Sequence, residues 1–237
     1  MKSQESVRDS LTPLIDRGST IGAPVRLYHF LPTEFALDDI EKRRIKISQI
    51  DQLNDPFELW CVYQKNWELR WALRAFKEEM NTRFGMLCYS RHWHNPLLWS
   101  HYANKHRGMC LGFDLPQRVV KPITYLTKRP ILKIPPTQED IDLLLFSKFA
   151  DWKYEEEFRN WFRIDERDAA TGFYFYPFDR FLRLREVIVG PLCDVAEAKI
   201  RDTLKGYKDK IRIIKARLAF RSFRVVKNRK GFRDSAK

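Results

Sequence analysis

The sequence predicts an α+β protein with mixed, largely antiparallel sheets and flanking helices. Hydrophobic residues are 44% of the 237 residues, which is enough to form a buried core. Segments typical of strands and of amphipathic helices follow one another in no regular order, and no internal repeat is evident. Because no boundary is evident either, we expect one domain over residues 25–226, with an N-terminal extension (1–24) and a basic C-terminal tail (227–237).

The first elements of the domain are a strand, a short helix and a second strand. The segment before them is polar and has no steady hydrophobic period, so we interpret it as an extension. RLYHF (26–30) is typical of a strand, and Pro32 with Thr33 marks the start of a helix. Residues 44–48 alternate isoleucine with polar residues, as a half-buried strand does.

The middle of the domain continues with helices and strands around a proline turn. A residue before proline avoids the helical region, so NDPFE is predicted to be a turn. Asn95 is a good helix cap and Pro96 fits a first helical turn. The expected elements are a turn at 54–58, a helix at about 64–83, a strand at 86–90, a helix from 96 and a strand at 108–113.

The last part of the domain is predicted to be mainly strands. The expected strands are 119–125, 157–164, 173–176 and 186–189, the expected helices are 138–149 and 195–204, and a hairpin is expected from 211–218 and 220–226. Bases alternate with apolar residues in this hairpin. We therefore expect the bases to line one of its faces.

Almost all of the excess positive charge lies near the C-terminus. The chain has 44 Lys and Arg against 31 Asp and Glu, a net charge of +13, and residues 199–237 carry +12 of it. A one-sided positive field attracts polyanions, which predicts a nucleic-acid partner. The alternative is a solvated surface that aids solubility. The candidate phosphate-binding residues are Arg212, Arg217, Arg221 and Arg224.

Common functional motifs are absent from the sequence. It contains no GxGxxG, GxxxxGK[ST], GxSxG, HExxH or CxxC. The four cysteines are scattered among apolar neighbours, so we expect small buried residues rather than disulfides or reactive thiols. No apolar run approaches the roughly 18 residues that span a membrane, and no secretory signal is evident. We expect a cytoplasmic protein without a membrane partner.

Four of the five histidines lie close together in the sequence, at His92, His94, His101 and His106. On a helix, successive residues turn by about 100°, which would separate His101 from His106. No acidic ligand lies nearby in the sequence. We therefore expect structural roles for these histidines and assign no metal site.

The segment KYEEEFRNWF concentrates charge and aromatic residues. In a strand, Glu157 and Arg159 share one face, while Phe158 and Phe162 share the other. We expect the two phenylalanines to pack in the core and the charged pair to look into a cleft. The alternative is a solvated ladder of ion pairs, which would contribute little to stability.

Several short segments occur together and in a characteristic order. They are LYHF (27–30), Ser48, NDPFE (54–58), LCYS (87–90), PLLWSHYA (96–103), HRGMCLGFD (106–114), Tyr125, Arg129 with Pro130, and WxYExExR (152–159). This combination resembles the bacterial family named domain of unknown function 2971, over about residues 26–226. The family name implies no activity.

A second resemblance concerns RLYHF, the helix that follows it and RRIKIS, which are similar to the start of ADP-ribosyltransferase-type folds with split sheets. This resemblance implies NAD as a substrate, with His29 holding its adenosine ribose and Glu157 stabilising a cationic transition state. Tyr89 or Ser90 would be the middle element of the site. The remaining residues that we assign by this resemblance are Tyr28, Ser48, Asn54 and Arg159 for NAD binding, and Tyr102 and Glu155 for catalysis.

Three functions remain open at this point. The first is an NAD-consuming transferase acting on a nucleic acid or another acidic target. The second is a metal-dependent nuclease, for which the candidate carboxylates are Asp55, Glu58, Asp114 and Glu157. The third is a non-catalytic module that binds nucleic acid through bases and exposed aromatic residues.

We also expect NDPFE and PLLWSHYA to form a cleft. Asn54 and Asp55 can make an Asx-type turn. Phe57 would be buried as a plug, and Glu58 would reach inward. Trp99 and Tyr102 would lie on the packed side of their helix, where an aromatic residue with a polar tip can border a pocket.

Overall fold

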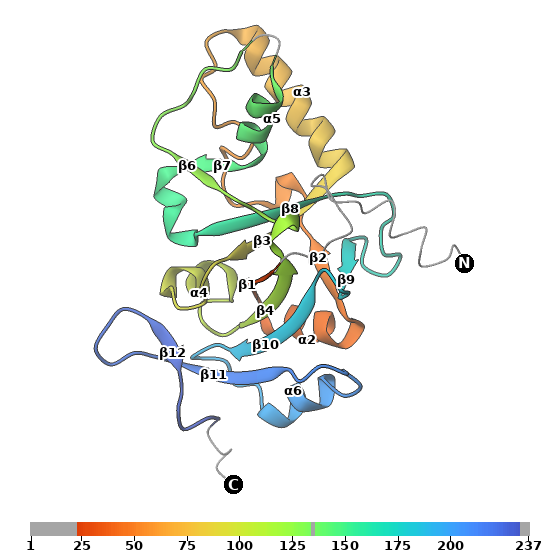
Figure 1. Cartoon of the computed structure of the whole chain (residues 1–237), viewed down its shortest axis with the longest axis vertical. Coiled ribbons are helices and arrows are strands. Elements are labelled where there is room, and N and C mark those ends of the chain that lie inside the picture. The colour runs from red at the N-terminus through yellow and green to blue at the C-terminus, as the bar shows by residue number, and fades with distance from the viewer. Residues whose placement is uncertain (1–22, 134–135, 233–237) are drawn as a thin grey trace. The chain divides into compact units, whose positions relative to one another are not determined.

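The computed structural model describes residues 23–133 and 136–232 (Figure 1). It contains 29% helix and 31% strand in mixed, mostly antiparallel sheets with flanking helices, which confirms the α+β class. The described chain divides into two compact units, a first unit of residues 46–88 and 118–176 and a second unit of residues 23–45, 89–117 and 177–232. Within the described residues, no helix is long and apolar enough to cross a membrane.

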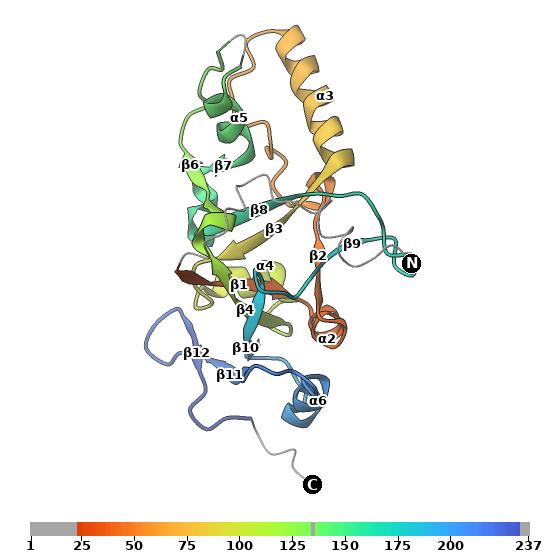
Figure 2. The ribbon, with the colours of Figure 1, turned by 45° about the vertical axis from the view of Figure 1, so that its right-hand side comes forward.

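The second unit is built on five sheet strands, in the order β12-β11-β10-β4-β1, followed by the end of β3. Its strands are β1 (Pro24–Leu31), β4 (Met109–Pro116), β10 (Arg183–Val189), β11 (Arg212–Leu218) and β12 (Val225–Lys227), and its helices are α2 (Thr33–Lys42), α4 (Pro96–Tyr102) and α6 (Glu197–Thr203). Helix α6 lies between β10 and β11 in sequence, as the parallel pairing of these strands requires. Figure 2 shows α6 beside these strands.

The centre of the second unit is the pairing of β1 with β4. The two strands are antiparallel and in register from Pro24 opposite Pro116 to Leu31 opposite Met109. Seven of the eight residues of β4 are buried, because strands flank it on both sides and side chains cover both of its faces. Phe30 packs edge-on against the fully buried Trp99 of α4, with ring centroids 5.2 Å apart.

The first unit has a smaller sheet and a larger share of helix. Its elements are η1 (Ile50–Gln52), α3 (Trp67–Arg83), β5 (Lys121–Pro122), β6 (Thr124–Leu126), α5 (Gln138–Leu145), β7 (Ser147–Phe149), η3 (Ala150–Glu155) and β8 (Glu157–Arg163). Strand β8 lies between β5 and β3, and β6 pairs with β7 in parallel. Asn66 caps α3, and a capping box formed by Thr137 and Asp140 begins α5. The core gathers Leu59, Met86 and Trp161.

Strands β2 (Arg44–Ile47), β3 (Phe84–Ser90) and β9 (Tyr174–Pro177) and the turn η2 (Gln117–Val119) belong partly to each unit. The chain therefore passes between the units inside regular elements rather than through linkers. A sequence shows a boundary when a polar or Gly/Pro-rich linker separates two domains. No such linker exists at these crossings.

Most predicted elements are confirmed to within a few residues. Two elements of the first unit differ, and so does the strand expected at 220–226, because β12 begins only at Val225. The helix expected at 138–149 ends at Leu145, because Ser147–Phe149 form β7 against β6. The strand expected at 119–125 is divided into η2, β5 and β6, with Ile123 buried between the two strands. Strand pairing outweighs helix propensity in the first case, as tertiary context often does. Nearly all of the predicted extension (1–24), and the end of the tail (233–237), lie outside the described residues.

Candidate functional site

Five charged side chains of the first unit form what we call the buried charge network: Glu58, Lys148, Glu155, Glu157 and Arg159. Strand β8 contributes two of them, and β7, η3 and the NDPFE turn contribute one each. All five are at most 6% exposed. Charges this deeply buried need partners, because each would otherwise lose its hydration without compensation.

Arg159 is the centre of this network. Its guanidinium donates to both carboxylate oxygens of Glu58, at 2.5 and 2.8 Å, and to Oε1 of Glu157 at 2.6 Å. A further donation reaches the backbone carbonyl of Leu145 at 3.3 Å. Lys148 Nζ lies 2.6 Å from Glu155 and 2.8 Å from Glu157. The guanidinium of Arg159 thus bridges the carboxylates of Glu58 and Glu157. The ammonium of Lys148 bridges the carboxylates of Glu157 and Glu155.

The network keeps Glu157 ionised. Burial alone would raise the pKa of Glu157, but the charges of Arg159 and Lys148 outweigh burial and lower it to about 2. Tyr125 lies beside the network, and its hydroxyl accepts the backbone N–H of Glu157 at 2.8 Å. Burial raises the pKa of Tyr125 to about 12, so its hydroxyl stays protonated at neutral pH.

The expectation that Glu157 and Arg159 look into a cleft is wrong. They are 4% and 0% exposed, and the next residue on their face, Trp161, is a core residue of the first unit. Both faces of β8 are covered, so alternation within the strand could not tell which face was open. A carboxylate held by two cations supports a structural role for Glu157 more strongly than the stabilisation of a transition state.

The NDPFE turn is partly as expected. Asp55 Oδ1 accepts the backbone N–H of Phe57 at 2.9 Å, which confirms an Asx-type turn. Glu58 reaches inward as predicted, to Arg159. Phe57 is not a buried plug, because it is 44% exposed. The turn sends its carboxylate, rather than its aromatic ring, into the unit.

The residues assigned to NAD by resemblance are divided between the two units. Ser48, Asn54, Glu155, Glu157 and Arg159 belong to the first unit, and Tyr28, His29, Tyr89, Ser90 and Tyr102 to the second. Within the second unit, Tyr28 pairs with Ser90 across β1 and β3, and the rings of His29 and Tyr89 lie 6.1 Å apart. Successive residues of a strand face opposite sides of a sheet, so Tyr28 with Ser90 and His29 with Tyr89 form two pairs on opposite faces. An NAD site remains a prediction.

A second group of charges lies on one face of the sheet in the second unit. This charged sheet face consists of Arg26, Tyr28, Asp114, Arg185, Glu186 and Arg212. Arg26 donates to both oxygens of Asp114, at 2.5 and 3.0 Å, and Arg185 approaches the same carboxylate at 3.1 Å. Glu186 accepts from the Tyr28 hydroxyl at 3.1 Å and also bonds Arg212.

The register of the strands explains why these side chains meet. Arg26 stands opposite Asp114, and Tyr28 and Glu186 both stand opposite Gly112. A Cβ at Gly112 would lie 3.0 Å from Cβ of Glu186 and 3.1 Å from Cε1 of Tyr28, so glycine leaves room for this pair. Burial, followed by the charge of Glu186, raises the pKa of Tyr28.

Sequence reasoning missed Arg26, Arg185, Glu186 and Lys148. A signal for Glu186 exists, because this charged residue directly precedes the apolar run of 187–189, where burial demands a partner. Lys148 gives the same signal, because it is a charged residue that follows the apolar run of 143–146 after one serine. The partners themselves lie far away in sequence, so periodicity could not identify them.

The loop between β11 and β12 exposes aromatic and basic side chains together. Ala219 N donates to Arg224 O at 2.9 Å, so the hairpin loop comprises residues 220–223. Phe220 is 90% exposed and Phe223 is 98% exposed. The guanidinium of Arg217 lies over the Phe220 ring, 4.4 Å from its centroid. We call residues 217–224, which are the last two residues of β11 and the chain up to β12, the basic aromatic loop. Figure 1 shows this segment projecting beyond the paired strands.

The expectation that the four candidate arginines line one face is wrong. Arg212 and Arg217 differ by an odd number of positions on β11 and lie on opposite faces. Arg212 belongs to the charged sheet face, where it bonds Glu186. Arg221 and Arg224 are exposed in the loop, although a strand was predicted from residue 220. The loop forms because β12 begins only at Val225, whose N–H donates to His94 O at 2.8 Å.

Histidines and cysteines have structural surroundings in the described part of the chain. His94 Nδ1 lies 2.8 Å from Val225 O, and His106 Nε2 lies 3.0 Å from Ser100 Oγ. All four cysteines are free. Cys61, Cys110 and Cys193 are buried as predicted, and Cys88 is half-buried. Among the described residues, no group of three or more His, Cys, Asp or Glu is arranged to hold a metal ion.

Comparisons with known proteins give no relatives. No family model, no curated protein and no solved structure matches the chain. The two resemblances stated from the sequence therefore remain predictions, and the geometry of the described residues carries the argument.

Proposed function

We propose that this protein binds single-stranded nucleic acid through the basic aromatic loop. The observation that carries the proposal is the exposure of Phe220 and Phe223, at 90% and 98%. Burying a phenylalanine side chain stabilises a fold by roughly 1.5–3 kcal/mol. Because Phe220 and Phe223 are exposed, they contribute almost none of this stabilisation to their unit. Neighbouring exposed aromatic residues are suited to a partner that covers them.

The charges around the rings favour a nucleic acid. Arg217 lies over Phe220, and Arg221 and Arg224 flank Phe223 in sequence. Within the described residues, no side-chain ion pair neutralises any of these three arginines. Proteins that bind single strands without sequence preference combine aromatic rings, on which bases stack, with cations that contact phosphates. A duplex keeps its bases stacked on one another and would use only the cations.

The proposal is tested by replacing the two rings. Phe220→Ala with Phe223→Ala should weaken binding to a fluorescent oligodeoxythymidine, since stacking contributes about 1–3 kcal/mol per base. Duplex binding should change much less. The matched control is Phe35→Ala, because Phe35 is an exposed phenylalanine of the same unit, 57% exposed. Fluorescence anisotropy measures both affinities.

The cations are tested separately through the salt dependence. Replacing Arg217, Arg221 and Arg224 by Gln should reduce the log–log salt slope by about 2, since each phosphate contact on a single strand contributes about 0.7. A charge-matched control replaces Lys199, Lys208 and Lys210, which are exposed elsewhere in the same unit. Equal effects of the two triple variants would indicate a diffuse field instead. Binding to anionic vesicles but not to oligonucleotides would overturn the proposal.

A further inference from the structure

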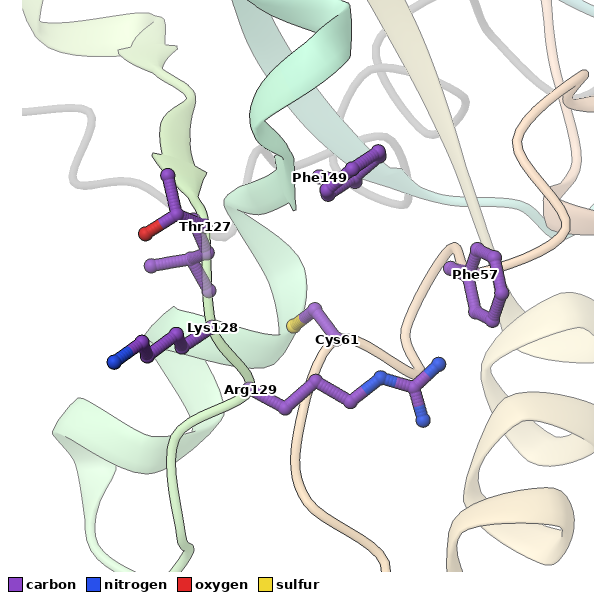
Figure 3. Close-up of a pocket in the computed structure, with 7 residues that line it drawn as sticks. Phe57, Cys61, Thr127, Lys128, Arg129 and Phe149 are labelled. Carbon is purple, nitrogen blue, oxygen red and sulfur yellow. The ribbon is translucent and has the colours of Figure 1, made fainter.

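A pocket of about 270 Å³ lies in the first unit, and its lining includes no residue of the buried charge network (Figure 3). Its walls come from three segments: the chain from Phe57 in the NDPFE turn to Cys61, residues 126–129, and the end of β7. Pairing of Leu126 with Phe149 fixes two of these segments to each other. Tyr63 N donates to Pro130 O at 2.8 Å and fixes the third. The pocket is thus held by backbone bonds.

The interior of the pocket is apolar and aromatic. Phe57 and Phe149 are 44% and 45% exposed, and Figure 3 shows them on two different sides of Cys61. Cys61 is 7% exposed, and its Sγ lies 2.9 Å from Ser147 Oγ. Burial raises the pKa of this thiol, so Cys61 lines the pocket as a neutral surface. Such a site favours a planar apolar group between the rings.

The charge at the pocket is positive. None of the seven lining residues is acidic, whereas Lys128 and Arg129 are both exposed bases. The guanidinium of Arg129 lies over the Phe57 ring, 4.8 Å from its centroid. In Figure 3 the ammonium of Lys128 extends away from Cys61, and Arg129 extends toward Phe57. Arg129 is therefore the cation that a ligand in this pocket would meet.

We infer that this pocket binds a small aromatic anion, a planar ring bearing a carboxylate or a phosphate. The ring would lie against Phe149 over Cys61, and the anion would accept from the guanidinium of Arg129. The ligand needs both its ring and its anionic group, because the apolar lining favours an aromatic ring and the guanidinium favours a carboxylate or a phosphate. The volume suits one small ring system rather than an extended chain, since it falls just below the usual range for ligand pockets. The inference is independent of the proposed nucleic-acid binding, since other residues carry it.

The test uses two anionic probes and one neutral probe. 2-Naphthoate and adenosine monophosphate carry the carboxylate and the phosphate, and 2-naphthamide has the shape of the first without its charge. Calorimetric titration should show saturable binding of at least one anion. 2-Naphthamide should bind at least about tenfold more weakly than 2-naphthoate, because a hydrogen bond to a charged group contributes roughly 1.5 kcal/mol or more, and each ~1.4 kcal/mol is tenfold. The tighter of the two anions identifies the headgroup.

Variants locate the binding. Arg129→Gln should weaken binding of the anion about tenfold and leave 2-naphthamide unchanged, and Phe149→Ala should weaken both. Lys128→Gln is the control of equal charge change and should have little effect. A thermal unfolding curve confirms that each variant is folded. No saturable binding of either anion, or equal losses for Arg129→Gln and Lys128→Gln, would overturn the inference.

Discussion

The buried charge network of the first unit and the charged sheet face of the second use the same residue types in opposite surroundings. Arg159 is fully buried, whereas the side chain of Arg212 is 66% exposed. Each bonds a glutamate that is nearly inaccessible, Glu58 or Glu186. The stability lost with an arginine therefore depends on whether the glutamate that it bonds keeps other partners. Removing Arg159 takes a cationic partner from both Glu58 and Glu157. Removing Arg212 leaves Glu186 bonded to Arg26 and Tyr28.

The largest effect is expected from Arg159→Met. Removing one partner of a buried ion pair costs about 3–5 kcal/mol, because the remaining charge is left without compensation. Arg212→Met in the charged sheet face should cost no more than about 1 kcal/mol, as exposed pairs do. Urea unfolding followed by circular dichroism measures both. Similar losses in the two variants would remove the distinction between the two clusters.

The second prediction concerns acid. Because the folded state lowers the pKa of Glu157 from 4.5 to about 2, its ionisation stabilises the fold above about pH 4.5. This contribution should be lost as the pH falls from about 4.5 to about 2. Glu157→Gln should be less stable at neutral pH and less sensitive to acid across this window. Urea midpoints measured against pH test it; parallel curves for the variant and the unchanged protein would contradict it.

A small effect is expected from Tyr28→Phe, which removes the hydroxyl that donates to Glu186. The loss should be about 1 kcal/mol, because arginines still satisfy the carboxylate. Tyr174→Phe is the matched control, since its hydroxyl accepts from Arg167 at 3.0 Å in an exposed position. It should change stability by less than about 0.5 kcal/mol. A loss of several kcal/mol for Tyr28→Phe would show that the charged sheet face depends on each of its partners as strongly as the buried charge network does.

The fold class and most elements could be predicted because local patterns specify them. Asn95 with Pro96 marks the start of α4, and alternating isoleucines mark β2. The end of α5 could not be predicted, because it depends on the pairing of β7 with β6. Local sequence favours a longer helix there, and a partner from outside the segment decides against it.

The candidate sites were harder to predict than the fold. The concentration of charge in KYEEEFRNWF correctly indicated a cluster of interacting charged residues. Its environment was misjudged, because burial of Glu157 and Arg159 depends on Lys148 and Glu58. Phe220 and Phe223 were assigned to a strand, because phenylalanine favours strands. Only the late start of β12 at Val225 shows that they lie in a loop.

The interleaving of the two units has a consequence for the order of events on the ribosome. All segments of the first unit exist once Tyr176 has been made, whereas the second unit still lacks β10, β11 and β12. Until β10 emerges, one side of the apolar strand β4 has no neighbour. Unpaired apolar strand edges promote aggregation, so we expect the nascent chain to be most prone to aggregation during this interval.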